Sequence, residues 1–135
     1  MIYSLYNLVA QADAERLLPA LGVDGFVIRR FDGAGVANAH DLWQAAVSQL
    51  GIETVGGWDG FADRMWSALL PDDDESDRVA LVWEHADVLV AGELRAFLAA
   101  FDTLTTIGRQ AYEQQIQVLT FYLGEGRSFP PLDEL

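Results

Sequence analysis

An alternation of short apolar segments with helical patterns constrains the fold of this chain more than any other feature. Three segments, at residues 26–31, 79–83 and 116–123, are typical of buried strands. The middle one is a continuous apolar run of the kind that parallel sheets bury on both faces. Helical patterns separate the three, and strand–helix–strand connections bring consecutive strands alongside in parallel. The sequence therefore predicts an α/β fold with a small three-stranded parallel sheet packed with helices.

The helices between these strands have recognisable boundaries. The first covers about residues 38–50, with Asn38 in the N-cap position that side-chain acceptors favour. The second covers about 59–70, and its apolar residues recur on one side. A longer pattern covers 87–114, with a break expected near Gly92. Because the sheet is small, we expect helices to cover one of its faces heavily.

The two ends of the chain lie outside this alternation. Residues 1–22 hold an apolar segment from Ile2 to Ala10 and a short helical pattern, which we interpret as an N-terminal extension packing on the core. Residues 23–124 form that core, and 125–135 form a C-terminal tail. The whole chain has the length of one ordinary domain, so a single domain over 1–135 is predicted.

Charge narrows the choice of partner. The chain has 21 acidic and 8 basic residues, a net charge of −13, and every basic residue is arginine. Binding to nucleic acid needs clustered positive charge, so we expect no nucleic-acid partner. A negative field would instead attract a basic protein and raise the rate of encounter. Acidity that serves only solubility is the simpler alternative.

Other classes of protein are disfavoured by what the sequence lacks. It contains no cysteine, so neither a disulfide framework nor a cysteine-ligated metal is expected. No apolar run approaches the roughly 18 residues of a membrane span, and the N-terminus has no signal-peptide pattern. The sequence predicts a cytoplasmic protein with no membrane association, no metal and no cofactor.

Three short motifs resemble those of the barstar family of intracellular ribonuclease inhibitors, in the same order. Residues 32–42 are similar to that family's first turn, helix cap and first helix. Residues 57–63, Gly-Trp-Asp-Gly-Phe-Ala-Asp, resemble its second-helix motif, and residues 82–87 resemble its second strand and following turn. The similarity covers roughly 26–123. It implies a barstar-like fold and a protein that inhibits a ribonuclease.

The resemblance also implies a partner-binding site. In the family, the second helix and the loop before it enter the nuclease active site, where aspartates take the place of substrate phosphate. Carried over residue by residue, the matching carboxylates are Asp59 and Asp63, with Asp63 central. Trp58, Gly57 and Glu53 surround them, and Trp58 is expected to be exposed because it flanks Gly57.

The chemistry of these residues supports the same site. Asp59 and Asp63 are four residues apart and share one helix face, where their repulsion costs roughly 0.2–0.5 kcal/mol. Arg64 points about 100° away around the helix and is not expected to neutralise them. The alternative explanation is that Asp59 is only an N-cap and Asp63 an ordinary acid of the first turns.

Two departures from the family pattern affect the predicted contacts. Residues 53–55, Glu-Thr-Val, stand where the family has an aromatic pair and a glycine, and Gly57 replaces an asparagine. The partner contacts are therefore expected to differ from the family's usual ones. The family's last helix supplies a further acid, for which Asp102 and Glu113 are candidates.

Weaker patterns suggest other sites. Residues 33–35, Gly-Ala-Gly, resemble part of a dinucleotide-binding motif, but Asn38 stands at the third glycine position. The acidic run 72–77 lacks the glycine and the closing glutamate of a calcium-binding loop. His85, with Glu84 beside it, follows a strand at the edge where α/β sheets often bind ligands.

The sequence thus predicts a stoichiometric inhibitor rather than an enzyme. Its expected partner is a basic ribonuclease or nuclease toxin, for which it would be the immunity protein, and it is expected to be a monomer when free. One alternative is a barstar-like binding module with a partner that is not a nuclease. A second alternative, less favoured, is a small-molecule enzyme that works near His85.

Overall fold

The structure, a computed structural model, describes residues 3–134 and has a four-stranded parallel sheet, not the predicted three-stranded one. The three predicted strands are present as β2 (Val27–Asp32), β3 (Arg78–Glu84) and β4 (Gln117–Gly124). A fourth strand, β1 (Tyr6–Ala10), lies at one edge, and the strand order is β1-β4-β3-β2. Each neighbouring pair is parallel, which confirms the predicted α/β class.

Strand β1 corrects the interpretation of residues 1–22 as an extension that only packs on the core. The strand pairs residue by residue with 120–124 of β4 and so belongs to the sheet itself. It escaped prediction because it is short, contains Asn7, and passes into a helical turn without an intervening Gly or Pro. Ile2, the first residue of the predicted apolar segment, lies outside the described residues.

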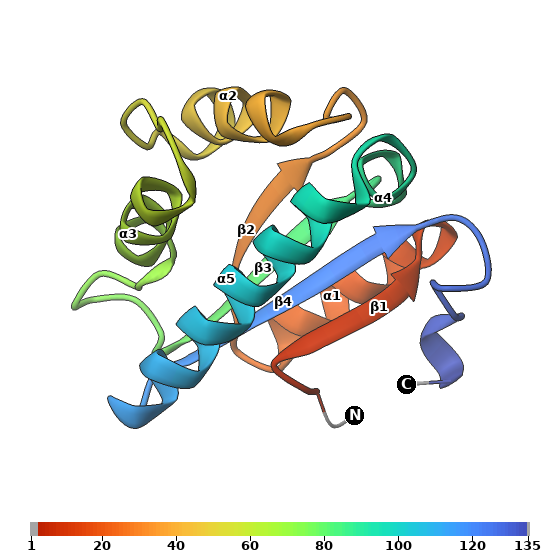
Figure 1. Cartoon of the computed structure of the whole chain (residues 1–135). Coiled ribbons are helices and arrows are strands. Elements are labelled where there is room, and N and C mark those ends of the chain that lie inside the picture. The colour runs from red at the N-terminus through yellow and green to blue at the C-terminus, as the bar shows by residue number, and fades with distance from the viewer. Residues whose placement is uncertain (1–2, 135) are drawn as a thin grey trace.

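Helices cover both faces of the sheet. The short 3-10 turn η1 (Gln11–Asp13) leads into α1 (Ala14–Val23), which lies behind the sheet in Figure 1. On the opposite face, α2 (Ala39–Leu50), α3 (Trp58–Leu69) and α5 (Leu94–Glu113) enclose the larger core. The prediction that helices cover one face heavily is confirmed, and α1 covers the other.

Strand β3 shows how the two cores share the sheet. Val79, Leu81 and Trp83 enter the core beneath α2, α3 and α5, whereas Ala80 and Val82 enter the core beneath α1. Successive side chains of a strand point to opposite faces, so burial on both faces demands an unbroken apolar run. This is why the segment was recognisable from sequence.

The predicted helix boundaries hold at two specific positions. Asn38 caps α2, because its side-chain oxygen accepts a hydrogen bond of 2.8 Å from the Asp41 backbone N–H. The long helical pattern divides at Glu93 into α4 (Asp87–Gly92) and α5. Gly92 is required there, since a Cβ atom would collide with the carbonyl oxygen of Ala37.

The C-terminal segment packs against the N-terminal half of the fold. Its 3-10 turn, η2 (Leu132–Glu134), places Leu132 in the core beneath α1, and the Ala10 N–H of β1 donates to the Pro130 carbonyl at 2.8 Å. Residues 125–134 therefore hold the carboxyl end of β1 in place through this hydrogen bond and the packing of Leu132. Among the described residues, no helix is both long and apolar enough to cross a membrane.

Candidate protein-binding surface on helix α3

Helix α3 presents the two predicted aspartates to solvent. Its apolar residues Phe61, Met65 and Leu69 are buried in the larger core, which fixes the rotation of the helix. Asp59 and Asp63 lie on another side and are both exposed. The helix begins at Trp58, one residue before the predicted start, with Gly57 in extended conformation at the N-cap.

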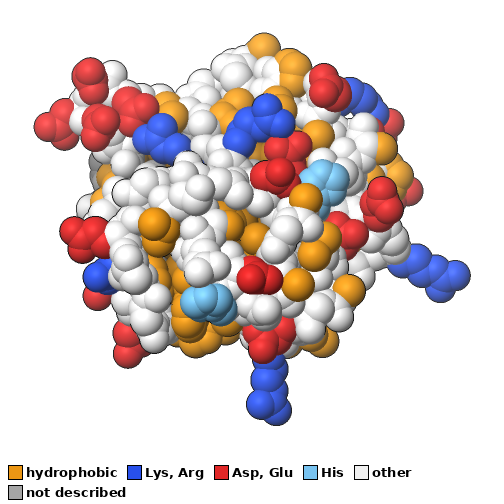
Figure 2. Space-filling view, turned by 90° about the horizontal axis from the view of Figure 1, so that it is seen from above, with side chains coloured by type: hydrophobic (Ala, Val, Ile, Leu, Met, Phe, Trp, Pro, Cys, Tyr) orange, Lys and Arg blue, Asp and Glu red, His pale blue; other side chains and the backbone are white. Residues whose placement is uncertain are grey.

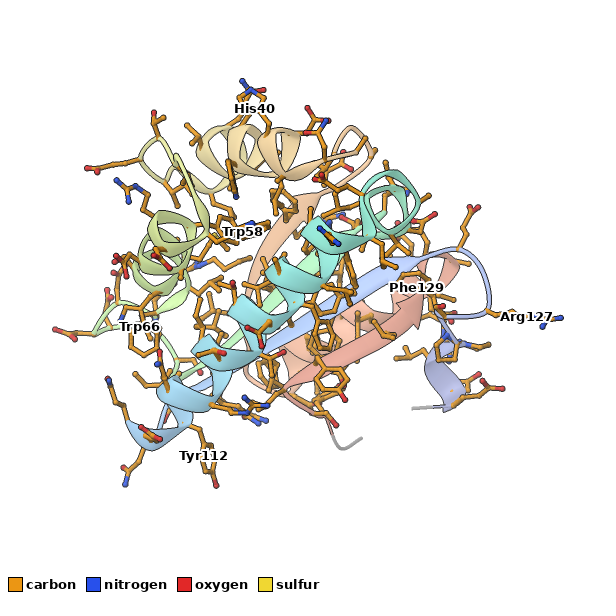
Figure 3. The ribbon with its side chains drawn as sticks, viewed as in Figure 1. His40, Trp58, Trp66, Tyr112, Arg127 and Phe129 are labelled. Atoms are coloured by element: carbon orange, nitrogen blue, oxygen red, sulfur yellow. The ribbon has the colours of Figure 1, made fainter. Side chains whose placement is uncertain are left out.

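Trp58 is half-buried, so the prediction that it is exposed is wrong. Its ring packs edge-on against Trp43 of α2, with centroids 5.4 Å apart, and against Phe61 at 5.7 Å. Figure 3 shows Trp58 directed inward from α3. The residue therefore joins α2 to the start of α3 and holds Gly57 and Asp59 in place.

Neither of the two aspartates has a cationic partner among the residues that the structure describes. Among the ion pairs of residues 3–134, none of 4.0 Å or less includes Asp59 or Asp63. Arg64 turns instead toward the preceding loop, where it lies 3.7 Å from the carboxylate of Glu53 and donates to the Gly60 carbonyl. The expectation that Arg64 does not neutralise the pair is confirmed.

Asp63 lies between two hollows. The first, about 510 Å³, is formed by α3 and the loop after α2, and Glu53 and Arg64 line it together with Asp63. The second, about 440 Å³, lies between α3 and α5, where Asp63 and Asp102 line it with Trp66. Both hollows are open to solvent. Asp63 is thus the common member of two recesses that each contain a second carboxylate.

The structure distinguishes the two candidate acids of the last helix. Asp102 shares the second hollow with Asp63, whereas Glu113 lines a separate hollow at the far end of α5, beside Tyr112. The sequence could not separate them, because both are exposed residues of one long helix. The contact of Arg64 with Glu53 was also missed, since it depends on the path of an irregular loop.

A group of acidic side chains lies on the side of the molecule that carries α3. Figure 2 shows acidic side chains gathered along its left margin, the side on which α3 and the loop after it lie in Figure 1. That loop carries Asp72, Asp73 and Asp74, all exposed. Arg29 of β2 pairs with Glu75 of this loop at 2.9 Å. Hydrogen bonds from the Asp72 backbone N–H and from this arginine lower the pKa of the Glu75 carboxyl. The loop thus adds negative charge beside the candidate surface.

His85 lies at a separate polar hollow of about 340 Å³, lined also by Arg30, Asp32, Gln49 and Glu84. Its acidic residues are already engaged: Glu84 pairs with Arg30 at 2.9 Å, and Asp32 accepts from a backbone N–H at 2.9 Å. His85 itself has a left-handed backbone with φ of 56°, which is uncommon outside glycine. Among the described residues, no group of three or more metal-binding side chains is present.

No protein-family model matches the chain, and no curated protein matches it.

Proposed function

We propose that this protein inhibits a basic enzyme, with a ribonuclease as the expected class, by covering its active site with α3. The observation that carries the proposal is the position of Asp63. It is exposed, has no cationic partner in the described part of the chain, and lines two hollows that contain Glu53 and Asp102. A basic active site that binds phosphates presents several cationic side chains. Carboxylates arranged in this way complement such a site.

The proposed mechanism needs no covalent step. Asp63 and Asp59 would accept hydrogen bonds from arginine or lysine side chains that otherwise bind substrate phosphates. Trp58, half-buried and packed against Trp43 of α2, would hold the start of the helix rigid, so little conformational entropy would be lost on binding. The net charge of −13 would accelerate encounter with a basic partner. We place this activity in the cytoplasm, as an immunity function against a ribonuclease toxin.

The barstar-like relationship is part of this proposal. The three motifs that carry it fall on the turn before α2 with the start of that helix, on the start of α3, and on the end of β3 with the turn that follows. The four-stranded sheet and the replacement of an asparagine by Gly57 suggest a partner that differs from the family's usual nuclease. A binding module whose partner is not a nuclease remains the alternative for the same surface.

The test is a titration of the protein into a panel of basic ribonucleases, with RNA cleavage and complex formation both measured. We expect one-to-one inhibition by the wild type, and a loss of about 2–5 kcal/mol in binding for Asp63→Ala, because a charge in the partner loses its counter-charge. Asp73→Ala is the matched control, since it removes the same charge from the exposed loop. It should change mainly the association rate, and only slightly.

Three results would decide between the alternatives. Equal loss for Asp63→Ala and Asp73→Ala would mean that only overall charge matters and would contradict the proposed contacts. Complex formation without loss of RNA cleavage would favour the alternative binding module. If His85→Ala abolished an enzymatic activity that Asp63→Ala left intact, the polar hollow at His85 would be the functional site, as the small-molecule enzyme alternative expects.

A further inference from the structure

Strand β1 leaves one edge of the sheet open. The backbone groups of Leu5 face β4, because its carbonyl accepts from the Thr120 N–H at 3.0 Å. Backbone groups alternate in direction along a strand, so those of Tyr6, Leu8 and Ala10 point away from the sheet. Ala10 agrees with this, since its N–H donates to Pro130 rather than to β4. Within residues 3–134, Tyr6 and Leu8 have no backbone partner on that side.

The open edge is limited at both ends. Before it, the chain bends at Leu5, and the Ser4 N–H and carbonyl both bond to the Asn7 side chain, at 3.1 and 2.9 Å. After it, the Pro130 carbonyl already occupies the Ala10 N–H. Only the N–H and C=O groups of Tyr6 and Leu8 remain. A long partner strand would collide with the bend at Leu5 or with the segment around Pro130. A partner strand that itself exposes only two residues would fit between them.

The two edges of the sheet differ in charge. The outer strand β2 carries Arg29, Arg30 and Asp32, and charged side chains of this kind discourage strand addition. Strand β1 carries no charged residue. The usual protection against edge-to-edge pairing is therefore present at β2 and absent at the open part of β1.

Apolar side chains are exposed beside the open edge. Of the five large exposed hydrophobic residues in the described chain, four lie on β1 or α5: Tyr6 (47%), Leu94 (52%), Leu98 (53%) and Tyr112 (73%). The rings of Tyr6 and Phe101 of α5 pack with centroids 4.7 Å apart, and Leu98 and Leu94 lie one and two turns before Phe101 on the same helix face. Figure 1 shows no helix in front of β1, because α5 lies over the centre of the sheet.

We propose that β1 pairs antiparallel with β1 of a second copy of this chain, forming a symmetric dimer with a continuous eight-stranded sheet. Placing Tyr6 opposite Leu8 of the partner uses every free group of both edges, since residues opposite each other in such a pair exchange two hydrogen bonds. The same register stacks each exposed Tyr6 ring on the partner's Leu8 side chain, a favourable cross-strand pair.

The arrangement also suits the charges along α5. Arg95 at its start and Arg109 near its end are exposed, and no carboxylate of the described chain lies within 4.0 Å of either. Two-fold symmetry directs the Arg95 end of one α5 toward the end of the other that carries Arg109 and Glu113, and Glu113 is the acidic residue of α5 at that end. The acidic α3 surfaces remain on the outer sides of the pair, so dimer formation leaves them free.

The first test is sedimentation equilibrium of the full chain at low and high salt. We expect a monomer–dimer equilibrium that shifts toward dimer as salt screens the repulsion between two acidic chains. Tyr6→Lys should weaken the dimer about tenfold or more, because it loses the apolar pair and places two cations at the edge. Val23→Lys, an equal charge change at an exposed residue of α1, is the control and should not weaken it.

The second test addresses the register. The chain has no cysteine, so Tyr6→Cys and Leu8→Cys can each introduce the only thiol. Mixed and oxidised, the two variants should cross-link to each other faster than either does to itself, since paired Cα atoms about 5.5 Å apart are within disulfide reach. Equal self-linking overturns the register, and a monomer under all conditions overturns the dimer. Asp63→Ala should dimerise like the wild type, which separates this proposal from the inhibitory one.

Discussion

Arg64 places a positive charge beside the carboxylates of the proposed binding surface. It lines the same hollow as Asp63 and Glu53, and its Nε is buried without a hydrogen-bond partner among the described residues. Arg64→Gln should strengthen binding of a basic enzyme by about 0.2–1 kcal/mol. The substitution removes a partly exposed positive charge that would repel the cationic side chains of the partner. The measurement is the dissociation constant by titration calorimetry.

The control for this prediction is Arg127→Gln, the same charge change in an exposed loop after β4, which Figure 3 shows directed away from the molecule. It should alter binding less. Weaker binding by Arg64→Gln would show that this arginine positions Glu53 rather than opposing the partner.

Tyr122 links stability to alkaline pH. Its side chain is fully buried, its hydroxyl makes no hydrogen bond of ordinary geometry with the described residues, and burial strongly raises its pKa. Because the folded pKa lies above the unfolded value of about 10, this contribution to stability is complete below that pH and is lost above it. One such group lowers the free energy of unfolding by about 1.4 kcal/mol per pH unit.

Tyr122→Phe should therefore flatten the loss of stability between about pH 10 and pH 11, as measured by urea unfolding at each pH. At neutral pH the variant should be at least as stable as the wild type, since an unpaired buried hydroxyl is removed. Tyr112→Phe, at an exposed tyrosine, should behave as wild type. A marked loss of stability in Tyr122→Phe at neutral pH would reveal a hydrogen bond to its hydroxyl and contradict this account.

At the scale of elements, helix α3 begins without a side-chain cap, in contrast to α2, which Asn38 caps. Gly57 at its N-cap has an extended backbone, with φ of −179°, and a Cβ atom there would meet nothing within 4 Å. Gly57→Asn should therefore supply the missing acceptor and raise the free energy of unfolding by about 0.3 kcal/mol. Gly56→Asn is the matched control, because that position is equally open but is not the N-cap. An equal gain in both variants would contradict capping as the cause.

The elements also show where sequence reasoning succeeds. The run 79–83 and the Asn38 cap were recognisable because their causes are local: burial on both faces and an N-terminal acceptor. Strand β1 was not recognisable, because the strand that pairs with it, β4, lies more than a hundred residues away in the sequence.

The candidate site divides in the same way. The exposed pair Asp59 and Asp63 follows from helical spacing, so the sequence predicts it directly. The burial of Trp58 against Trp43, and the approach of Asp102 to Asp63, depend on how α2, α3 and α5 pack together. No local sequence pattern encodes how these three helices pack against one another. The residue types were therefore predictable and their partners were not.

For the whole molecule, charge gives the two proposed interactions opposite responses to salt. The rate constant for association with a basic enzyme should fall as the salt concentration rises, because the screening length falls from about 10 Å at 0.1 M to about 3 Å at 1 M. A decrease of at least about tenfold over that range is expected, measured by stopped-flow fluorescence, with little change in dissociation. Dimer formation should instead strengthen, since it joins two copies of charge −13.

The two responses can be measured on one preparation with matched variants. Tyr6→Lys should remove the salt-favoured association and keep the salt-sensitive enzyme binding, while Asp63→Ala should do the reverse. If both associations weakened with salt, the edge pairing would depend on Arg95 and Glu113 rather than on apolar contact. If enzyme binding strengthened with salt, α3 would bind through its apolar neighbours, and the carboxylates could not be its anchors.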